Sequence, residues 1–206
     1  MHYSLRNTNN MIGIVNYGAG NIFSLTAALD RVGLLYGMIN EEQDFHRYDH
    51  IIIPGVGHAG AAMQKLKESG LVDHIVALKK PVLGICVGMQ LLTAYSEEGN
   101  ANLLDLIPLN TLHFDQRIEG KVPHMGWNSI SPSGDSPLFH NIPDGSYVYF
   151  VHSYFIESDP VFSAAQCHYG IDFSAAIQRD NFFGVQFHPE KSGKVGEQLL
   201  LNFAKL

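Results

Sequence analysis

Cysteines and basic residues are both scarce in this sequence, and each shortage excludes a class of protein. Only Cys86 and Cys167 occur among the 206 residues, so no disulfide framework is expected and a reducing cytoplasm is the predicted compartment. Lysine and arginine number 13 against 20 acidic residues, which gives a net charge of −7. A chain of this acidity is not expected to have nucleic acid or an anionic membrane as its main partner.

Long apolar runs are also missing. No stretch approaches the roughly 20 apolar residues of a membrane-spanning helix, and residues 1–10 lack the apolar core of a signal peptide. We therefore expect residues 1–10 to be a flexible extension and residues 11–206 to form one domain. A hydrophobic content of 46% with 16% charged residues is typical of a globular chain large enough for one substantial core.

The first half of the chain alternates between short apolar runs and segments with helical spacing. Strands are predicted at residues 11–16, 34–39 and 50–53 and from Pro81 onward, helices at 21–33, 61–66 and 71–78, and a polar connection at 41–48. This alternation indicates an α/β fold whose mostly parallel sheet carries helices on both faces. In such folds the loops that follow the strands share one edge, where ligands bind.

The second half has a different pattern. Its apolar segments are short, often alternating, and separated by glycine, proline and aspartate; they cover residues 106–114, 127–131, 147–156, 162–168, 174–178 and 183–187. These segments predict antiparallel strands and hairpins. An amphipathic helix over residues 192–206 is expected to close the chain.

The stretch Gly84-Ile-Cys86-Val-Gly88 lies between a predicted strand and apolar residues whose helical spacing continues to Tyr95. A nucleophile at a strand–helix turn, with glycine two residues away on each side, is the pattern of a nucleophile elbow. The turn raises the side chain above the sheet edge, and the helix N-terminus favours a thiolate. A buried structural cysteine fits the same motif, which alone leaves both interpretations open. Cys167 lies in a predicted strand with no base motif beside it, and we expect a structural thiol.

A base for Cys86 is found near the end of the chain. His188 and Glu190 follow the predicted strand at 183–187, and Pro189 between them fixes the turn so that both side chains face one side. A histidine at a strand end is more often a surface residue, so His188 alone identifies no site. The chain lacks the histidine and cysteine spacings of zinc sites and the full glycine motif of a dinucleotide site, so no metal and no cofactor is predicted.

Two motifs together resemble the class I (triad) glutamine amidotransferases, which have a flavodoxin-like α/β fold. They are the stretches from Gly84 to Gln90 and from Gln186 to Glu190. Further motifs resemble one branch of that family, the HisH-type glutaminase subunits of imidazole glycerol phosphate synthase, and these cover residues 16–21, 54–57, 121–128, 151–154 and 190–192. The resemblance runs from about Met11 to the C-terminus.

The resemblance implies a reaction and the residues that perform it. Cys86 attacks the side-chain amide of L-glutamine to give a thioester and ammonia, His188 transfers the proton, and Glu190 orients the imidazole. The oxyanion is held by the Val87 N–H and by a peptide of a glycine-rich loop made of Gly55, Val56 and Gly57. The amino and carboxylate groups of glutamine are held by Gln90, His152, Ser153 and Tyr154.

The resemblance also implies a partner, because the chain is too short to contain an acceptor domain beside the glutaminase. The ammonia would pass to a HisF-type (β/α)8 barrel subunit, bound as a heterodimer, in histidine biosynthesis. Candidate contacts to the barrel are Asn21, Tyr149 and Lys191, although ordinary solvated surface explains each of them equally well.

Three other functions stay open at this point. A HisH-like subunit could supply ammonia to a HisF-like partner that amidates a surface-polysaccharide sugar, since acceptor specificity lies outside this chain. A stand-alone cysteine hydrolase is disfavoured by the motifs for a glutamine pocket. A non-catalytic interaction protein is disfavoured by the complete set of Cys86, His188 and Glu190.

Overall fold

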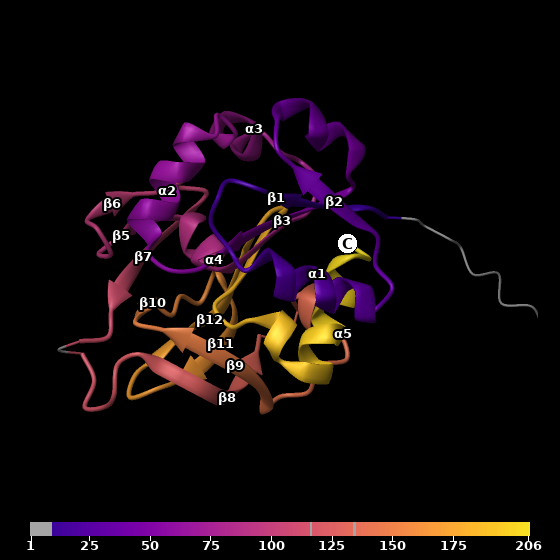
Figure 1. The fold of residues 1–206 in the computed structure, drawn as a ribbon. Helices are drawn as coiled ribbons and strands as arrows, with labels where there is room; N and C mark the ends of the chain where they lie inside the picture. Colours follow the sequence, from indigo (N-terminus) through magenta and orange to yellow (C-terminus); the bar gives the residue numbers. More distant parts are fainter. Residues whose placement is uncertain (1–9, 116, 134) are drawn as a thin grey trace, which may run out of the picture.

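The structure, a computed structural model, describes residues 10–115, 117–133 and 135–206 (Figure 1). Residues 1–9 of the expected N-terminal extension lie outside the described residues. Asn10 donates a side-chain hydrogen bond to the Ala204 carbonyl at 3.0 Å, which ties the chain to its C-terminal region just before the first strand. Within the described part of the chain, no helix has both the length and the apolar character needed to cross a membrane.

A nine-stranded sheet forms the centre of the molecule, in the order β2-β1-β3-β4-β13-β12-β11-β8-β9. The first five strands run parallel: β2 (Tyr36–Ile39), β1 (Ile12–Val15), β3 (His50–Gly55), β4 (Val82–Cys86) and β13 (Phe182–Val185). The other four pair antiparallel: β12 (Asp172–Arg179), β11 (Ser163–His168), β8 (His124–Pro132) and β9 (Ser146–His152). The predicted α/β fold, with a parallel sheet and an antiparallel second half, is confirmed.

One segment that the sequence predicted as antiparallel has a mixed environment. As β13, it pairs antiparallel with β12 but parallel with β4, and so joins the two halves of the sheet. All four of its residues are buried, as expected for a strand covered on both faces. This position brings the carboxyl end of β13 beside that of β4.

Helices cover both faces of the parallel strands. α1 (Ile22–Arg31) connects β1 to β2, and α2 (Ala59–Glu68) lies in the connection from β3 to β4. These two connections run in opposite directions across the sheet. Because both crossovers are right-handed, they place the two helices on opposite faces. In Figure 1, α1 lies beside α5 (Gly193–Phe203), and α2 lies beside α4 (Val87–Leu91). The shorter helical elements are α3 (Val72–Val76) and the 3₁₀ helices η1 (Glu42–Arg47), η2 (Pro137–Phe139) and η3 (Pro189–Lys191).

A second sheet of four strands was not predicted from the sequence. Its order is β10-β7-β5-β6, with β10 (Tyr154–Ile156), β7 (Ile107–His113), β5 (Thr93–Ser96) and β6 (Ala101–Asn102). The prediction that helical structure continues to Tyr95 is wrong, because α4 ends at Leu91 and Tyr95 lies in β5. β-branched Thr93 begins the strand by pairing with β7, and its hydroxyl donates to the Gln90 carbonyl at 2.8 Å.

The parallel strands bring the predicted motifs to one edge of the sheet. Gly55, at the end of β3, is the register partner of Cys86, at the end of β4. Val185, at the end of β13, is the register partner of Ile85. The glycine-rich loop after β3, the Cys86 turn after β4 and the histidine motif after β13 therefore meet at the carboxyl edge, where α/β proteins place their sites.

Candidate active site

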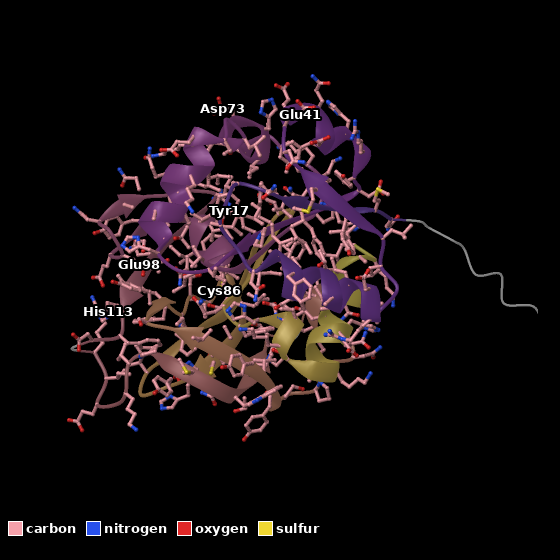
Figure 2. The ribbon with its side chains drawn as sticks, viewed as in Figure 1. Tyr17, Glu41, Asp73, Cys86, Glu98 and His113 are labelled. Carbon is pink, nitrogen blue, oxygen red and sulfur yellow. The ribbon has the colours of Figure 1, made fainter. Side chains whose placement is uncertain are left out.

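Cys86 lies at the turn between β4 and α4, in a backbone conformation that side chains rarely adopt. Its φ is 55° and its ψ is −112°. The glycines on either side allow this turn, because a Cβ at Gly84 would collide with the Gly88 carbonyl, and one at Gly88 would collide with the Ile53 carbonyl. Strain of this kind persists where the surrounding structure enforces it and is concentrated at functional sites. Figure 2 shows Cys86 near the middle of the molecule.

His188 and Glu190 form a buried pair beside Cys86. The Nδ1 atom of His188 lies 2.7 Å from Oε1 of Glu190, and their side chains are only 3% and 4% exposed. Pro189 begins the short helix η3, and this turn places the two side chains on the same side. Burial lowers the pKa of His188, but hydrogen bonds to Cys86 and Glu190 outweigh it and raise that pKa to about 10. The imidazole is therefore held between a sulfur and a carboxylate, as a proton-transfer group requires.

A pocket of about 350 Å³ opens in front of these groups. Its volume suits a small ligand. Most of the predicted site residues line it; the lining is Val56, Gly57, Cys86, Val87, Gln90, Glu98, Pro123, Val151, His152, Ser153, Tyr154, His188 and Lys191. Gly55 and Glu190 do not line this pocket, and instead border a small cavity that Asn21 and His188 also line.

The loop after β3 lies directly against the Cys86 turn. A Cβ at Gly55 would collide with the backbone of Val87 and Gly88, so only glycine permits this approach. Gly57 has a φ of 86°, another conformation that favours glycine. The buried Tyr17 hydroxyl donates to the Pro54 carbonyl at 2.7 Å and holds the start of the loop in place. Sequence reasoning missed Tyr17, although it lies in one of the motifs that carry the resemblance.

The predicted substrate residues form a connected polar wall. Gln90 is 2% exposed, its Nε2 lies 3.4 Å from the Tyr154 carbonyl, and its Oε1 has no partner among the described residues. Nδ1 of His152 donates to the same carbonyl at 2.7 Å. Burial lowers the pKa of His152 to about 3, so this histidine is neutral. Ser153 separates β9 from β10 and lines this wall of the pocket.

A carboxylate in the pocket was also missed. Glu98 lines the pocket, and its Oε2 accepts the backbone N–H of Ala59 at 2.6 Å, at the start of α2. Burial, followed by the nearby carboxylates of Glu98 and Glu97, raises the pKa of Tyr154. Glu98 lies in a turn after β5, and no local sequence pattern identifies such a residue, because its place in the pocket depends on the unpredicted second sheet.

The three candidate partner contacts differ in their surroundings. Lys191 Nζ lies 5.7 Å from the centre of the Tyr149 ring, and Trp127 packs edge-on against the same ring. Around this pair, Met125, Trp127 and Tyr147 are 62%, 55% and 60% exposed, which forms an apolar patch that the sequence did not predict. Asn21 has a structural task, since its side chain accepts the Ser24 N–H at 3.3 Å and caps α1.

The second thiol, that of Cys167, is buried and lies away from the pocket. Cys167 is 4% exposed in β11, and burial, with a smaller contribution from Asp172, raises its pKa to about 12. In the described residues, no three histidine, cysteine, aspartate or glutamate side chains gather in a way that could hold a metal ion.

Comparison with known proteins places this geometry in a family. The model of the glutamine amidotransferase class-I family matches residues 14–205. The imidazole glycerol phosphate synthase subunit HisH 2 of Pseudomonas aeruginosa is 44% identical over 201 residues, covering 95% of this chain and 100% of that protein. The HisH subunit of Pasteurella multocida is 46% identical over 194 residues, covering 94% and 97%.

Solved structures agree at the level of the fold. A crystal structure of a glutamine amidotransferase has a TM-score of 0.73 at 14% identity, and covers 95% of this chain and 99% of its own. PurLQS from Thermotoga maritima gives a TM-score of 0.67 at 17% identity and covers 95% and 98%. Since the family model spans nearly the whole chain and curated relatives exceed 40% identity, the chain belongs to the class-I glutamine amidotransferases.

Proposed function

We propose that this chain is the glutaminase subunit of an imidazole glycerol phosphate synthase, acting in the cytoplasm as a single domain over residues 11–206. The observation that carries the proposal is Cys86 on a strained turn beside the buried His188–Glu190 pair, in the wall of a pocket of ligand size. The relatives are named as HisH subunits of imidazole glycerol phosphate synthase, and these names support the same assignment.

The proposed reaction uses these groups in order. The Cys86 thiolate attacks the carbonyl carbon of the glutamine side-chain amide, and His188 gives a proton to the leaving ammonia. The thioester that remains is hydrolysed by water, which His188 activates in the reverse sense. Glu190 keeps the imidazole in position throughout.

The tetrahedral intermediates need donors for their oxyanion. The Val87 N–H follows the nucleophile directly, and a peptide of the loop from Gly55 to Gly57 lies beside it. Glycines on both sides of Val56 allow a peptide to turn at low cost. The loop can therefore rest with a carbonyl toward the site and turn an N–H inward when a partner favours that state.

Substrate recognition follows from the polar wall of the pocket. The buried, unpaired Oε1 of Gln90 and the carboxylate of Glu98 are acceptors for the α-ammonium group of glutamine. Backbone groups at Ser153 and Tyr154 are suited to the α-carboxylate. Glutamine then lies with its amide toward Cys86.

Ammonia delivery requires a second subunit. We assign this role to a HisF-type (β/α)8 barrel that covers the patch of Met125, Trp127 and Tyr147 beside the Tyr149–Lys191 pair. An apolar patch with a polar rim is typical of a protein interface. No metal or cofactor enters this scheme.

The test is to purify the chain with the barrel subunit from the same organism and to measure glutamate formation and acceptor conversion together. We expect the ammonia acceptor of imidazole glycerol phosphate synthase to stimulate glutamine hydrolysis and to be converted to imidazole glycerol phosphate. Conversion of a sugar acceptor instead would place the chain in polysaccharide amidation. Full hydrolysis without any partner would identify a stand-alone hydrolase and contradict the proposal.

A further inference from the structure

A buried glutamine contacts the sulfur of Cys86. Gln186 follows β13 directly, has no exposed surface, and donates its side-chain Nε2 to Cys86 Sγ at 3.8 Å. Its backbone N–H bonds to the Ala175 carbonyl at 2.8 Å, which fixes the residue at the junction of β13 and β12. A polar side chain buried this completely needs partners for both ends of its amide.

The direction of the Gln186 amide follows from a chain of hydrogen bonds that starts at a backbone carbonyl. The Tyr154 carbonyl can only accept, so the Gln90 atom 3.4 Å from it is the nitrogen, Nε2. That nitrogen carries a second hydrogen, which points to Gln186 across 3.1 Å. Gln186 must therefore turn its oxygen toward Gln90 and its N–H groups toward Cys86.

We propose that Gln186 is a catalytic residue whose amide N–H stabilises the thiolate of Cys86. The inference rests on the proposed role of Cys86 as the nucleophile. A donor to the charged form of a group favours that form, and the effect is larger in a site shielded from water. With the amide turned the other way, its oxygen would repel the thiolate. Gln90 thus has a second role, because it sets the direction in which Gln186 points.

The test uses Gln186→Met, which keeps the length of the side chain and removes the donor. Iodoacetamide alkylation of Cys86, followed by mass spectrometry across a pH series, reports the thiolate without requiring glutamine turnover. We expect the midpoint of the alkylation profile to move to higher pH by about one unit, which corresponds to about a tenfold change. Glutaminase kcat should fall by about tenfold, with KM changed by less than about twofold.

The matched control is Asn202→Leu. Asn202 is also a buried amide, and it donates to the Leu138 and His140 carbonyls at 3.0 and 2.7 Å, within α5 and away from the site. Its replacement should lower the unfolding temperature and leave the alkylation profile in place.

Gln186→Glu is the second variant, because a carboxylate facing the sulfur should move the profile further than Gln186→Met.

The outcomes separate this inference from the proposed function. An alkylation profile of Gln186→Met that coincides with that of the wild type would overturn the role of Gln186. If Gln186→Met does not fold, an unchanged profile in Gln186→Glu has the same meaning. Either result leaves the proposed function intact as long as wild-type Cys86 is alkylated much faster than Cys167. Equal alkylation of the two cysteines in the wild type would instead contradict the nucleophile assignment and, with it, this inference.

Discussion

Cys86 and Cys167 lie in two regions that contain the same chemical groups in different arrangements. In each region a histidine Nδ1 lies 2.7 Å from a carboxylate oxygen, and the pairs are His188–Glu190 and His168–Asp172. The side chains of the first pair are 3% and 4% exposed, whereas those of the second are 71% and 70% exposed. Both thiols are buried. Neither burial of the cysteine nor the presence of a histidine–carboxylate pair therefore distinguishes the two regions.

The backbone makes the difference. Successive side chains of a strand point to opposite faces, so buried Cys167 and exposed His168 in β11 point away from each other. Cys86 instead ends β4, and its turn faces the carboxyl end of the neighbouring strand β13, which His188 follows. The Cys86 thiol and the His188 imidazole meet here because two parallel strands end at one edge. Sheet topology, and not proximity in the sequence, therefore brings the histidine to the cysteine.

Replacing the cysteines should give the largest contrast. Cys86→Ser is expected to reduce kcat for glutamine hydrolysis by about 10⁴-fold or more, because a serine hydroxyl is far less ionised than a thiol at neutral pH. Cys167→Ala should retain activity within about twofold, since Cys167 does not line the pocket that holds Cys86. Steady-state glutamate release measures both, and circular dichroism verifies that each variant is folded. An equal loss of kcat in the two variants would contradict the different roles proposed for Cys86 and Cys167.

The glycine-rich loop beside Cys86 gives the next largest effect. We expect the isolated chain to hydrolyse glutamine slowly and the barrel subunit with its acceptor ligand to raise kcat by about 10²–10³-fold, the value of one oxyanion donor. A partner produces this change only if it binds the turned loop more tightly than the resting one. The test measures kcat with the chain alone, with the partner, and with the partner and its ligand. Three equal kcat values would contradict the proposed turning of the loop.

The carboxylates offer a matched pair of substitutions. Glu190→Gln should lower kcat by about 10²-fold, because the imidazole loses its orienting charge. It should also lower the pKa of His188 from its raised value, so the pH dependence of kcat should change in the variant. Asp172→Asn removes the exposed counterpart and should leave both kcat and its pH dependence as in the wild type. A similar loss from both substitutions would show that the effect is structural.

A third histidine extends the comparison to stability and gives the smallest effect. His152 is buried, and burial holds its folded pKa at about 3, below the ordinary value of 6.5. As the pH falls below 6.5, the unfolded chain takes up a proton that the folded protein refuses, so stability should fall toward acid. His152→Gln should reduce this acid slope by at most about 1.4 kcal/mol per pH unit. Urea unfolding at pH 7, 6 and 5 tests this, and identical slopes in both proteins would contradict it.

Local sequence patterns predict the parts of the site that depend on neighbouring residues. The glycines around Cys86 predict its turn; the small size of Gly84 is needed against Gly88 in the same five residues, and that of Gly88 against Ile53 of the neighbouring strand. Pro189 predicts the His188–Glu190 arrangement because the turn that it begins lies within the same short segment. Four of the five parallel strands also follow from the alternation of apolar runs and helical segments, whereas β13 was predicted as antiparallel.

Features that depend on distant contacts could not be predicted in this way. β5 was mistaken for helix because Leu91, Leu92 and Tyr95 have helical spacing, and only pairing with β7 reveals the strand. Glu98 reaches the pocket through that unpredicted sheet. The role of Gln186 depends on Gln90, which lies 96 residues away in the sequence. Exposed patches such as that around Trp127 leave no periodic signal either.

We propose that the two buried thiols differ in reactivity because Cys86 lies beside His188 and lines the ligand-sized pocket, whereas Cys167 does not line it. The most direct measurement treats the protein with an electrophilic glutamine analogue and quantifies the modified cysteines by mass spectrometry. We predict stoichiometric labelling of Cys86, protection by excess L-glutamine, and no labelling of Cys167. Equal labelling of both thiols, or labelling of Cys167 alone, would contradict it.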